Sequence, residues 1–239
     1  MATRVGGIAG FEARERGFFL AMAIAIAATI ASVFLLQFAM GRSSLDSPWW
    51  VHVHALSFMA YLALFVTQTL LVYRGSTALH RRLGAVGAAW LGWMVVIGVF
   101  TTARAVTMGR VPFFFEPNVF LAMDWTLVAG AAGLAWAGIA LRRRTDWHRR
   151  LMLCSMIFFM APAWGRLLPL PLLGSWALWA AFAPLFLYLA VAVLYDWRAR
   201  GMVHPAYLWG GAVMVALTAM MRPLASTPLF LTLAARLSA

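Results

Sequence analysis

Residues 17–40 read GFFLAMAIAIAATIASVFLLQFAM, a stretch that contains no charged residue. A helix needs about 20 mostly apolar residues to cross the hydrocarbon core of a bilayer, so this stretch predicts a membrane-spanning helix. The tail at 223–239 is interrupted by Pro223 and Pro228 and is not counted as a span. We therefore predict an all-α, polytopic membrane protein, a bundle of seven transmembrane helices that forms a single domain, 1–239. The six further predicted spans lie at about 49–73, 78–104, 118–141, 147–168, 175–197 and 205–222.

The composition supports a membrane protein and excludes several classes of function. The chain is 64% hydrophobic and 11% charged, whereas soluble domains carry roughly 25% charged residues. All basic side chains other than histidine are arginine, so a lysine Schiff base such as that of retinal proteins is excluded. The net charge of +12 does not indicate nucleic-acid binding, because the arginines lie in short loops between apolar runs and form no single tract.

The arginines also predict the orientation of the chain. They concentrate at the N-terminus and in the loops that follow the second, fourth and sixth predicted spans. The positive-inside rule places such segments in the cytoplasm. We therefore expect the N-terminus inside and the C-terminus outside, in the inner (plasma) membrane of a bacterium.

A seven-residue motif occurs twice, at the start of the third and of the fifth predicted spans. TALHRRL at 77–83 and TDWHRRL at 145–151 have five positions in common. Each copy places its histidine, His80 or His148, in the first turn of a helix. A looser version precedes the seventh span, where His204 suits the N-cap because a proline follows it. Three of the five histidines are thus expected at one depth, on the cytoplasmic side.

These helix starts have three interpretations, which stay open. A helix N-terminus already carries partial positive charge, so a pair of arginines there indicates that an anion is bound, either a lipid headgroup or a soluble phosphate. Alternatively, the positive field keeps the histidines neutral, as ligands of a metal ion or of haem iron must be. In the third interpretation the arginines only fix the topology. The candidates are Arg81, Arg82, Arg149 and Arg150 for anionic lipid, and His80, His148 and His204 for a cofactor.

A second polar cluster is expected on the opposite, outer side. His54, Tyr61 and Gln68 are spaced by seven residues and share one face of the second span, and a polar stripe of this kind faces protein or water, not lipid. Asp124 is expected to pair with an arginine or with His54. The cluster is interpreted as structural ion pairs, as a ligand pocket, or as a proton or metal site with His52 and His54 as metal ligands. Its members are His54, Asp124, Arg104, Arg166 and Arg222.

The histidine pattern bears on the type of cofactor. A b-type haem in a helix bundle needs two axial ligands on facing helices at one depth, and the inner histidines meet the condition on depth. Two haems across the membrane are disfavoured, because the outer histidines, His52 and His54, lie on a single span. The favoured interpretation is a haem- or metal-binding membrane protein in a redox or sensory role. Whether the protein is an enzyme stays open.

Two other classes of protein also stay open. The topology and the three inner histidines resemble those of zinc-dependent membrane hydrolases of the ceramidase and adiponectin-receptor type, with Asp146 as a further ligand or partner. The His-x-x-x-His pair of those enzymes is absent from the last span. The main alternative is a non-catalytic or transporter-like subunit that binds anionic lipid or a small ligand. A membrane-protein partner or a second copy of the chain would suit such a subunit.

Several longer elements together carry a family resemblance. They are VHVHA at 51–55, LHRRLG at 79–84, VPFFFEP at 111–117, RRRTDWHRRLM at 142–152, GRLLP at 165–169 and VHPAYLWG at 203–210. With these elements the chain resembles a family of bacterial seven-helix membrane proteins to which no activity is assigned. The resemblance implies the same topology and adds no mechanism.

Overall fold

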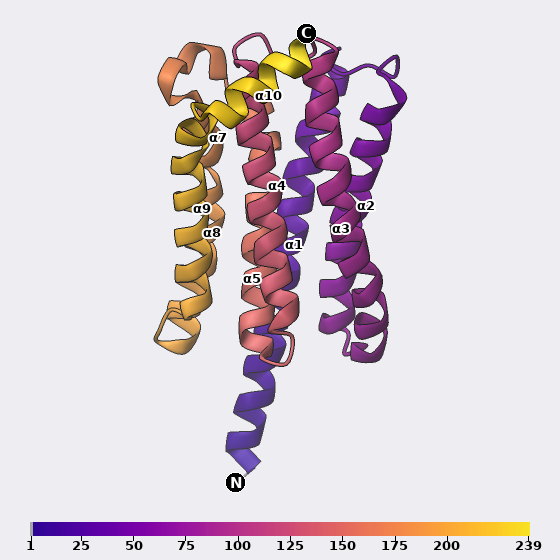
Figure 1. Cartoon of the computed structure of the whole chain (residues 1–239). Coiled ribbons are helices and arrows are strands. Elements are labelled where there is room, and N and C mark those ends of the chain that lie inside the picture. Colours follow the sequence, from indigo (N-terminus) through magenta and orange to yellow (C-terminus); the bar gives the residue numbers. More distant parts are fainter. Residues whose placement is uncertain (1) are drawn as a thin grey trace.

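The computed structural model describes residues 2–239, and the side chains of residues 10–239. Within this part of the chain all regular secondary structure is helical, as expected (Figure 1). The elements are α1 (Ala2–Ala39), α2 (Trp49–Tyr73), α3 (Thr77–Thr107), α4 (Pro117–Ala140), α5 (Thr145–Phe158), α6 (Ala161–Leu167), η1 (Leu170–Trp176), α7 (Ala177–Phe182), α8 (Leu185–Arg200), α9 (Pro205–Ala225) and α10 (Pro228–Ser238).

Six helical segments of the described residues are long and apolar enough to cross a membrane. They are Gly10–Ala39, Trp49–Tyr73, Thr77–Thr107, Pro117–Ala140, Leu170–Arg200 and Pro205–Ala225. Large apolar side chains are exposed along these segments, for example Leu56, Val96 and Leu187, and so much exposed apolar surface is typical of a protein that contacts lipid. The multi-pass character predicted from the sequence is therefore supported for six spans.

The predicted span at 147–168 is not one continuous helix. It is divided into α5 and α6 by a turn at Phe159 and Met160. Pro162 explains the break, because its ring nitrogen carries no hydrogen to donate to the carbonyl of Phe158, one turn earlier. With 14 residues, α5 alone is shorter than the roughly 20 that a span requires. The seventh span therefore stays a prediction.

The predicted span at 175–197 is also divided. It consists of α7 and α8, which are separated at Ala183 and Pro184, and the short 3-10 helix η1 precedes them. Proline again stands at the break, for the same reason as at position 162. The tail 223–239 contains α10, which lies across the end of the bundle and packs against α3 and α4 (Figure 1).

The central helices of the bundle are α4 and α5. α4 packs against α3, α5 and α9, while α5 also contacts α1, α8 and α9. α3 lies at the edge, between α2 and α4. Small buried residues on α4, among them Ala131, Ala135 and Gly138, allow its neighbours to approach closely. Any group on α5 is therefore surrounded by more elements than the equivalent group on α3.

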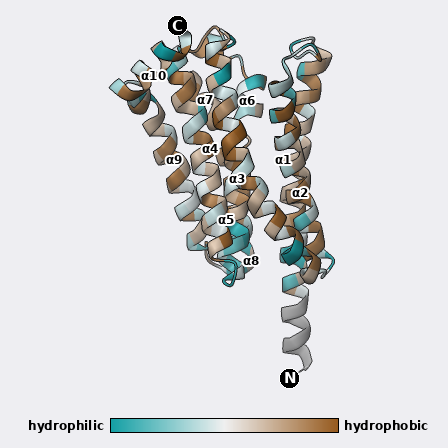
Figure 2. Cartoon of the chain, turned by 45° about the vertical axis from the view of Figure 1, so that its right-hand side comes forward, coloured by the Kyte–Doolittle hydropathy of each residue, from teal (hydrophilic) through white to brown (hydrophobic). Residues whose placement is uncertain are grey.

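The two ends of the bundle differ in charge. The end that carries residues 74–82, 141–150 and 198–204 contains most of the loop arginines, and we call it the arginine-rich end. Hydrophilic residues gather near the ends of the helices and apolar residues cover their middle parts (Figure 2). The start of α1 and the C-terminus lie at opposite ends of the bundle (Figure 1).

Candidate functional site

His80 and His148 lie next to each other at the arginine-rich end. They occupy the first turns of α3 and α5, and their ring centroids are 6.2 Å apart with an angle of 76° between the ring planes. Both residues are partly buried. The two equivalent histidines of the repeated motif are thus brought together although they are far apart in the sequence. We call them the histidine pair.

Each ring of the histidine pair is held through its Nδ1 atom. Nδ1 of His148 lies 2.8 Å from the carbonyl oxygen of Gly138 on α4, so this nitrogen carries the hydrogen. Nδ1 of His80 lies 2.6 Å from the side-chain amide nitrogen of Gln68 on α2, in the amide orientation that gives both ends of Gln68 a partner. Among the side chains of residues 10–239, neither Nε2 atom has a hydrogen-bond partner. The Nε2 atom of His148, whose hydrogen is on Nδ1, is therefore available to a ligand.

His204 does not join the histidine pair. It is the N-cap of α9, as expected, and its Nδ1 accepts a hydrogen bond of 3.1 Å from the Ala206 amide. Its Nε2 lies 2.9 Å from Oδ2 of Asp146. Both ring nitrogens of His204 are thus engaged within the protein, and of the three predicted histidines the structure brings His80 and His148 together. In the part of the chain with described side chains, no group of three or more His, Cys, Asp or Glu residues could hold a metal ion.

Arg150 lies at the centre of a buried ion cluster that the sequence did not reveal. Its side chain is fully buried, with Nε 2.8 Å from Oδ2 of Asp196 and Nη2 2.6 Å from Oδ1 of the same carboxylate. Nη2 also lies 3.1 Å from Glu15 Oε1, and Nη1 donates to the Asp146 carbonyl oxygen at 3.0 Å. Two-pronged contacts of this type are the strongest that a guanidinium makes with a carboxylate.

Two further arginines complete this cluster. Arg149 forms an ion pair of 2.8 Å with Glu15 Oε2, and Arg200 pairs with the other oxygen of that carboxylate. Glu15 comes from α1 and Asp196 from α8, so the cluster joins α1, α5 and α8. Counting Asp146 at its edge, three acidic and three basic groups balance each other. We call this set the acid-paired cluster: Glu15, Asp146, Arg149, Arg150, Asp196 and Arg200.

The arginine pairs of the two motif copies therefore differ in their surroundings. Arg150 has no exposed surface through which a lipid headgroup could reach it, and Arg149 faces Glu15. Arg81 and Arg82 are exposed, and in the described part of the chain neither forms an ion pair. The lipid-binding interpretation therefore fits the exposed pair Arg81 and Arg82 best, whereas Arg149, with 28% of its side chain exposed, already has a carboxylate partner.

Asp146 and His204 form the partly exposed edge of the acid-paired cluster. The side chain of Asp146 is 44% exposed and that of His204 12%. Partial burial alone would raise the pKa of the Asp146 carboxyl. Hydrogen bonds from His204 and from the Trp147 amide outweigh this effect and hold that pKa below its ordinary value. The contact therefore favours the ionised carboxylate.

The polar residues expected on the outer side do not form one ion-pair cluster. Thr102 donates a hydrogen bond of 3.3 Å to Asp124, but within residues 10–239 no arginine or histidine lies within ion-pair distance of this carboxylate. His54 packs on Phe58 at 4.5 Å between ring centroids, and its buried Nδ1 has no partner there. His52 lies apart, with Nε2 3.0 Å from the Leu45 carbonyl oxygen.

The three outer arginines contact different parts of the chain. Arg104 lies near Thr107 and Met108 of its own helix, Arg166 donates to the Pro162 carbonyl oxygen, and Arg222 donates to the carbonyl oxygen of Ser175. The guanidinium of Arg166 also stacks over the ring of Phe34 at 4.9 Å. Asp124 makes no direct ion pair in the described part of the chain, but Arg166 is the arginine that acts electrostatically on both Asp124 and His54, so the predicted pairing stays a prediction.

Sequence reasoning missed the partners of the site residues. Glu15, Asp196 and Gly138 were not candidates, and Gln68 was assigned to the outer stripe although it contacts His80. One signal for the acids was available, because the chain has only seven acidic residues for nineteen arginines. An acid near the end of a span in such a chain has a high chance of meeting an arginine.

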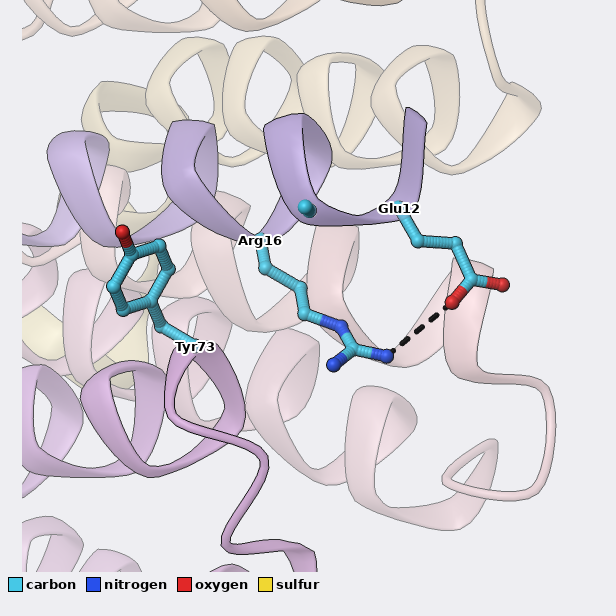
Figure 3. A pocket seen from close by; sticks show the side chains of 4 residues that line it. Glu12, Arg16 and Tyr73 are labelled. Atoms are coloured by element: carbon cyan, nitrogen blue, oxygen red, sulfur yellow. Dashed lines mark hydrogen bonds and ion pairs between the residues drawn. The ribbon is translucent and has the colours of Figure 1, made fainter. Parts of the chain in front are cut away.

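Two open hollows lie beside α1 at the arginine-rich end. One is bordered by Glu12, Ala13, Arg16 and Tyr73, and Figure 3 shows the ion pair between Glu12 and Arg16 at its edge. The other lies between α1 and α8, near Phe18 and Tyr195. Neither hollow borders the histidine pair. Comparison with models of known protein families, with curated proteins and with solved structures finds no match to this chain.

Proposed function

We propose that the chain is a multi-pass protein of the bacterial plasma membrane that binds a metal centre through His80 and His148. The arginine-rich end faces the cytoplasm in this proposal, because loop arginines accumulate on that side of a membrane. Support for the membrane assignment comes from six long apolar helices. The same proposal includes membership of the bacterial seven-helix family that the sequence resembles.

The observation that carries the metal site is the spacing of the histidine pair. The observed centroid distance is 6.2 Å. Two imidazoles this close on two different helices would hold a metal ion or a haem iron between them, and the iron of a b-type haem would supply redox chemistry.

The surroundings of the pair support a ligand role for His148 in particular. Histidine ligands of metals commonly donate their second ring N–H to a backbone carbonyl, which fixes the ring and raises its basicity. Gly138 provides such a carbonyl for His148 at 2.8 Å. A porphyrin would require side chains around the pair to move apart, because neither described hollow borders it.

The first experiment is the visible absorption spectrum of the detergent-purified protein, oxidised and reduced, with elemental analysis of the same sample. We expect a Soret band with sharp reduced α and β bands, and loss of these bands in His80→Ala and in His148→Ala. His204→Ala is the matched control and should keep the spectrum, because His204 is bonded to Asp146 and Ala206.

Two results would overturn this assignment. A colourless, metal-free preparation from cells that can load the cofactor would exclude both haem and a bare metal ion. Equal loss of absorbance in all three histidine variants would show that the pair has no special role. Metal without a porphyrin spectrum, lost in His80→Ala and His148→Ala alone, would keep the site and replace haem by an ion.

A second candidate function, binding of anionic lipid, is favoured by a separate observation. Arg81 and Arg82 are exposed at the first turn of α3, where the helix N-terminus adds partial positive charge. Within residues 10–239, the Arg81 guanidinium donates one hydrogen bond, of 3.4 Å, to the Thr77 carbonyl oxygen. Two unpaired guanidinium groups at the membrane surface suit a phosphate headgroup.

A further inference from the structure

The Gln68 side chain contacts both the ring and the backbone of His80. In the amide orientation that gives both ends of Gln68 a partner, its side-chain nitrogen lies 2.6 Å from Nδ1 and 3.1 Å from the carbonyl oxygen of His80, and its side-chain oxygen lies 2.8 Å from the Gly84 amide. The opposite orientation would place oxygen against the His80 carbonyl and nitrogen against the Gly84 N–H. Two backbone groups that cannot exchange roles therefore fix the orientation of the Gln68 amide.

This orientation decides which nitrogen of His80 carries the hydrogen. An amide N–H that points at Nδ1 requires an unprotonated Nδ1, so a neutral His80 carries its hydrogen on Nε2. His148 has the opposite arrangement, because the Gly138 carbonyl can only accept and Nδ1 of His148 must donate to it. The two rings thus present one protonated and one unprotonated Nε2 atom.

We propose that Gln68 holds the metal-free histidine pair as a proton donor and a proton acceptor, and that it opposes metal ligation by His80. His148 is ready to ligate, whereas His80 must first lose the hydrogen from Nε2 and gain one at Nδ1. The net proton count of the ring is unchanged, and the proton moves through solvent. The Gln68 amide must then rotate so that its oxygen accepts from Nδ1, which breaks its contacts with Gly84 and with the His80 carbonyl.

The ligation part of this inference rests on the proposed function, but the tautomer part does not. Most residues that hold a metal ligand increase affinity, and their loss weakens binding about 10- to 100-fold. Gln68 is predicted to act with the opposite sign. Loss of Gln68 should leave binding at least as tight as in the wild type, because the rotation is no longer needed.

The test is ¹⁵N NMR of metal-free protein labelled at histidine, above the ordinary histidine pKa of about 6.5. We expect Nε2–H at His80 and Nδ1–H at His148, assigned with the His80→Ala and His148→Ala variants. Gln68→Met should turn His80 into a mixture of tautomers and leave His148 unchanged. Gln37→Met is the matched control, because Gln37 is a buried glutamine that donates to the Arg166 carbonyl oxygen at the other end of the bundle.

The outcomes separate this inference from the proposed function. Nδ1–H at His80 in the wild type would overturn the tautomer assignment, even if Gln68→Met failed to fold. The second measurement titrates ferric haem b into wild type, Gln68→Met and Gln37→Met. Binding weakened 10-fold or more in Gln68→Met alone would overturn the opposing role of Gln68. Absence of haem binding by the wild type would refute the haem site but leave the tautomer assignment standing.

Discussion

The two copies of the repeated motif have nearly the same sequence and different environments. In the copy at 145–151, Arg150 is fully buried between Asp196 and Glu15. In the copy at 77–83, the equivalent Arg82 is exposed, and within residues 10–239 it has no ion-pair partner. The histidines of the two copies lie next to each other.

The position of each helix in the bundle explains this difference. α5 contacts α1 and α8, which supply Glu15 and Asp196, whereas α3 contacts α2, α4 and α10. α2 and α4 carry no acid near the arginine-rich end. The same motif therefore becomes a structural centre on α5 and an exposed basic patch on α3, because remote segments decide which partners it meets.

The largest effect that we expect distinguishes the two equivalent arginines. Arg150→Met removes the guanidinium that binds the buried Asp196 carboxylate through two nitrogen atoms, whereas Glu15 keeps its ion pairs with Arg149 and Arg200. Removal of one member of a buried ion pair costs about 3–5 kcal/mol. Arg82→Met is the matched control and should change stability by less than about 0.5 kcal/mol, as expected for an exposed site. The free energy of unfolding of the wild type and of each variant is measured in mixed detergent micelles, in which the fraction of denaturing detergent is increased stepwise.

A double variant tests the cause of this loss. Replacement of both members of a buried pair by apolar residues is often close to neutral, so Asp196→Leu should recover much of the stability lost in Arg150→Met. If the double variant is less stable than either single variant, a role of Arg150 other than charge compensation is indicated. Equal losses in Arg150→Met and Arg82→Met would contradict the comparison of the two copies.

An intermediate effect is expected on lipid selectivity. Each arginine near an anionic surface contributes about 1 kcal/mol, so Arg81→Gln with Arg82→Gln should lower the preference for anionic over neutral lipid roughly 30-fold. The control carries Arg104→Gln and Arg110→Gln, two substitutions at the opposite end of the bundle. The lipid retained by protein extracted from mixed nanodiscs is measured by mass spectrometry. Equal preference in both variants would exclude a site at Arg81 and Arg82.

The sequence predicted the helical class and most helix positions, because long apolar runs are a strong local signal. The limits of α2 match the predicted 49–73. The two interrupted spans are the exception, because Pro162 and Pro184 separate helices where continuous spans were expected. The extent of such a break depends on packing around it, which a local pattern does not contain.

The candidate site was predictable in part. The shared depth of His80 and His148 followed from the repeat, but their lateral contact depends on the order of helices around α4. His204 was expected at the same depth and bonds to Asp146 instead. Lateral neighbours arise from tertiary packing, so neither this contact nor the partners of Arg150 could be read from spacing along the chain.

The smallest effect concerns Asp146, which lies at the exposed edge of the acid-paired cluster. Its pKa is held below the ordinary value by the hydrogen bonds it accepts. A carboxyl whose pKa is lower in the folded state stabilises the fold above its unfolded pKa, about 3.9, and this contribution is lost as the pH falls through the folded pKa. Because the side chain is 44% exposed, we expect at most about 1 kcal/mol.

The measurement compares the free energy of unfolding of wild type and Asp146→Asn between about pH 5 and pH 3, a window around the ordinary aspartate pKa. The wild-type advantage should shrink as the pH falls. His204→Ala should reduce it in the same window, because it removes the hydrogen bond of 2.9 Å. A loss above about 2 kcal/mol at neutral pH in Asp146→Asn would exceed the range of an exposed pair. Asp146 would then contribute to stability as the buried members of the acid-paired cluster do, and the distinction between the exposed edge of the cluster at Asp146 and its buried centre at Arg150 would be wrong.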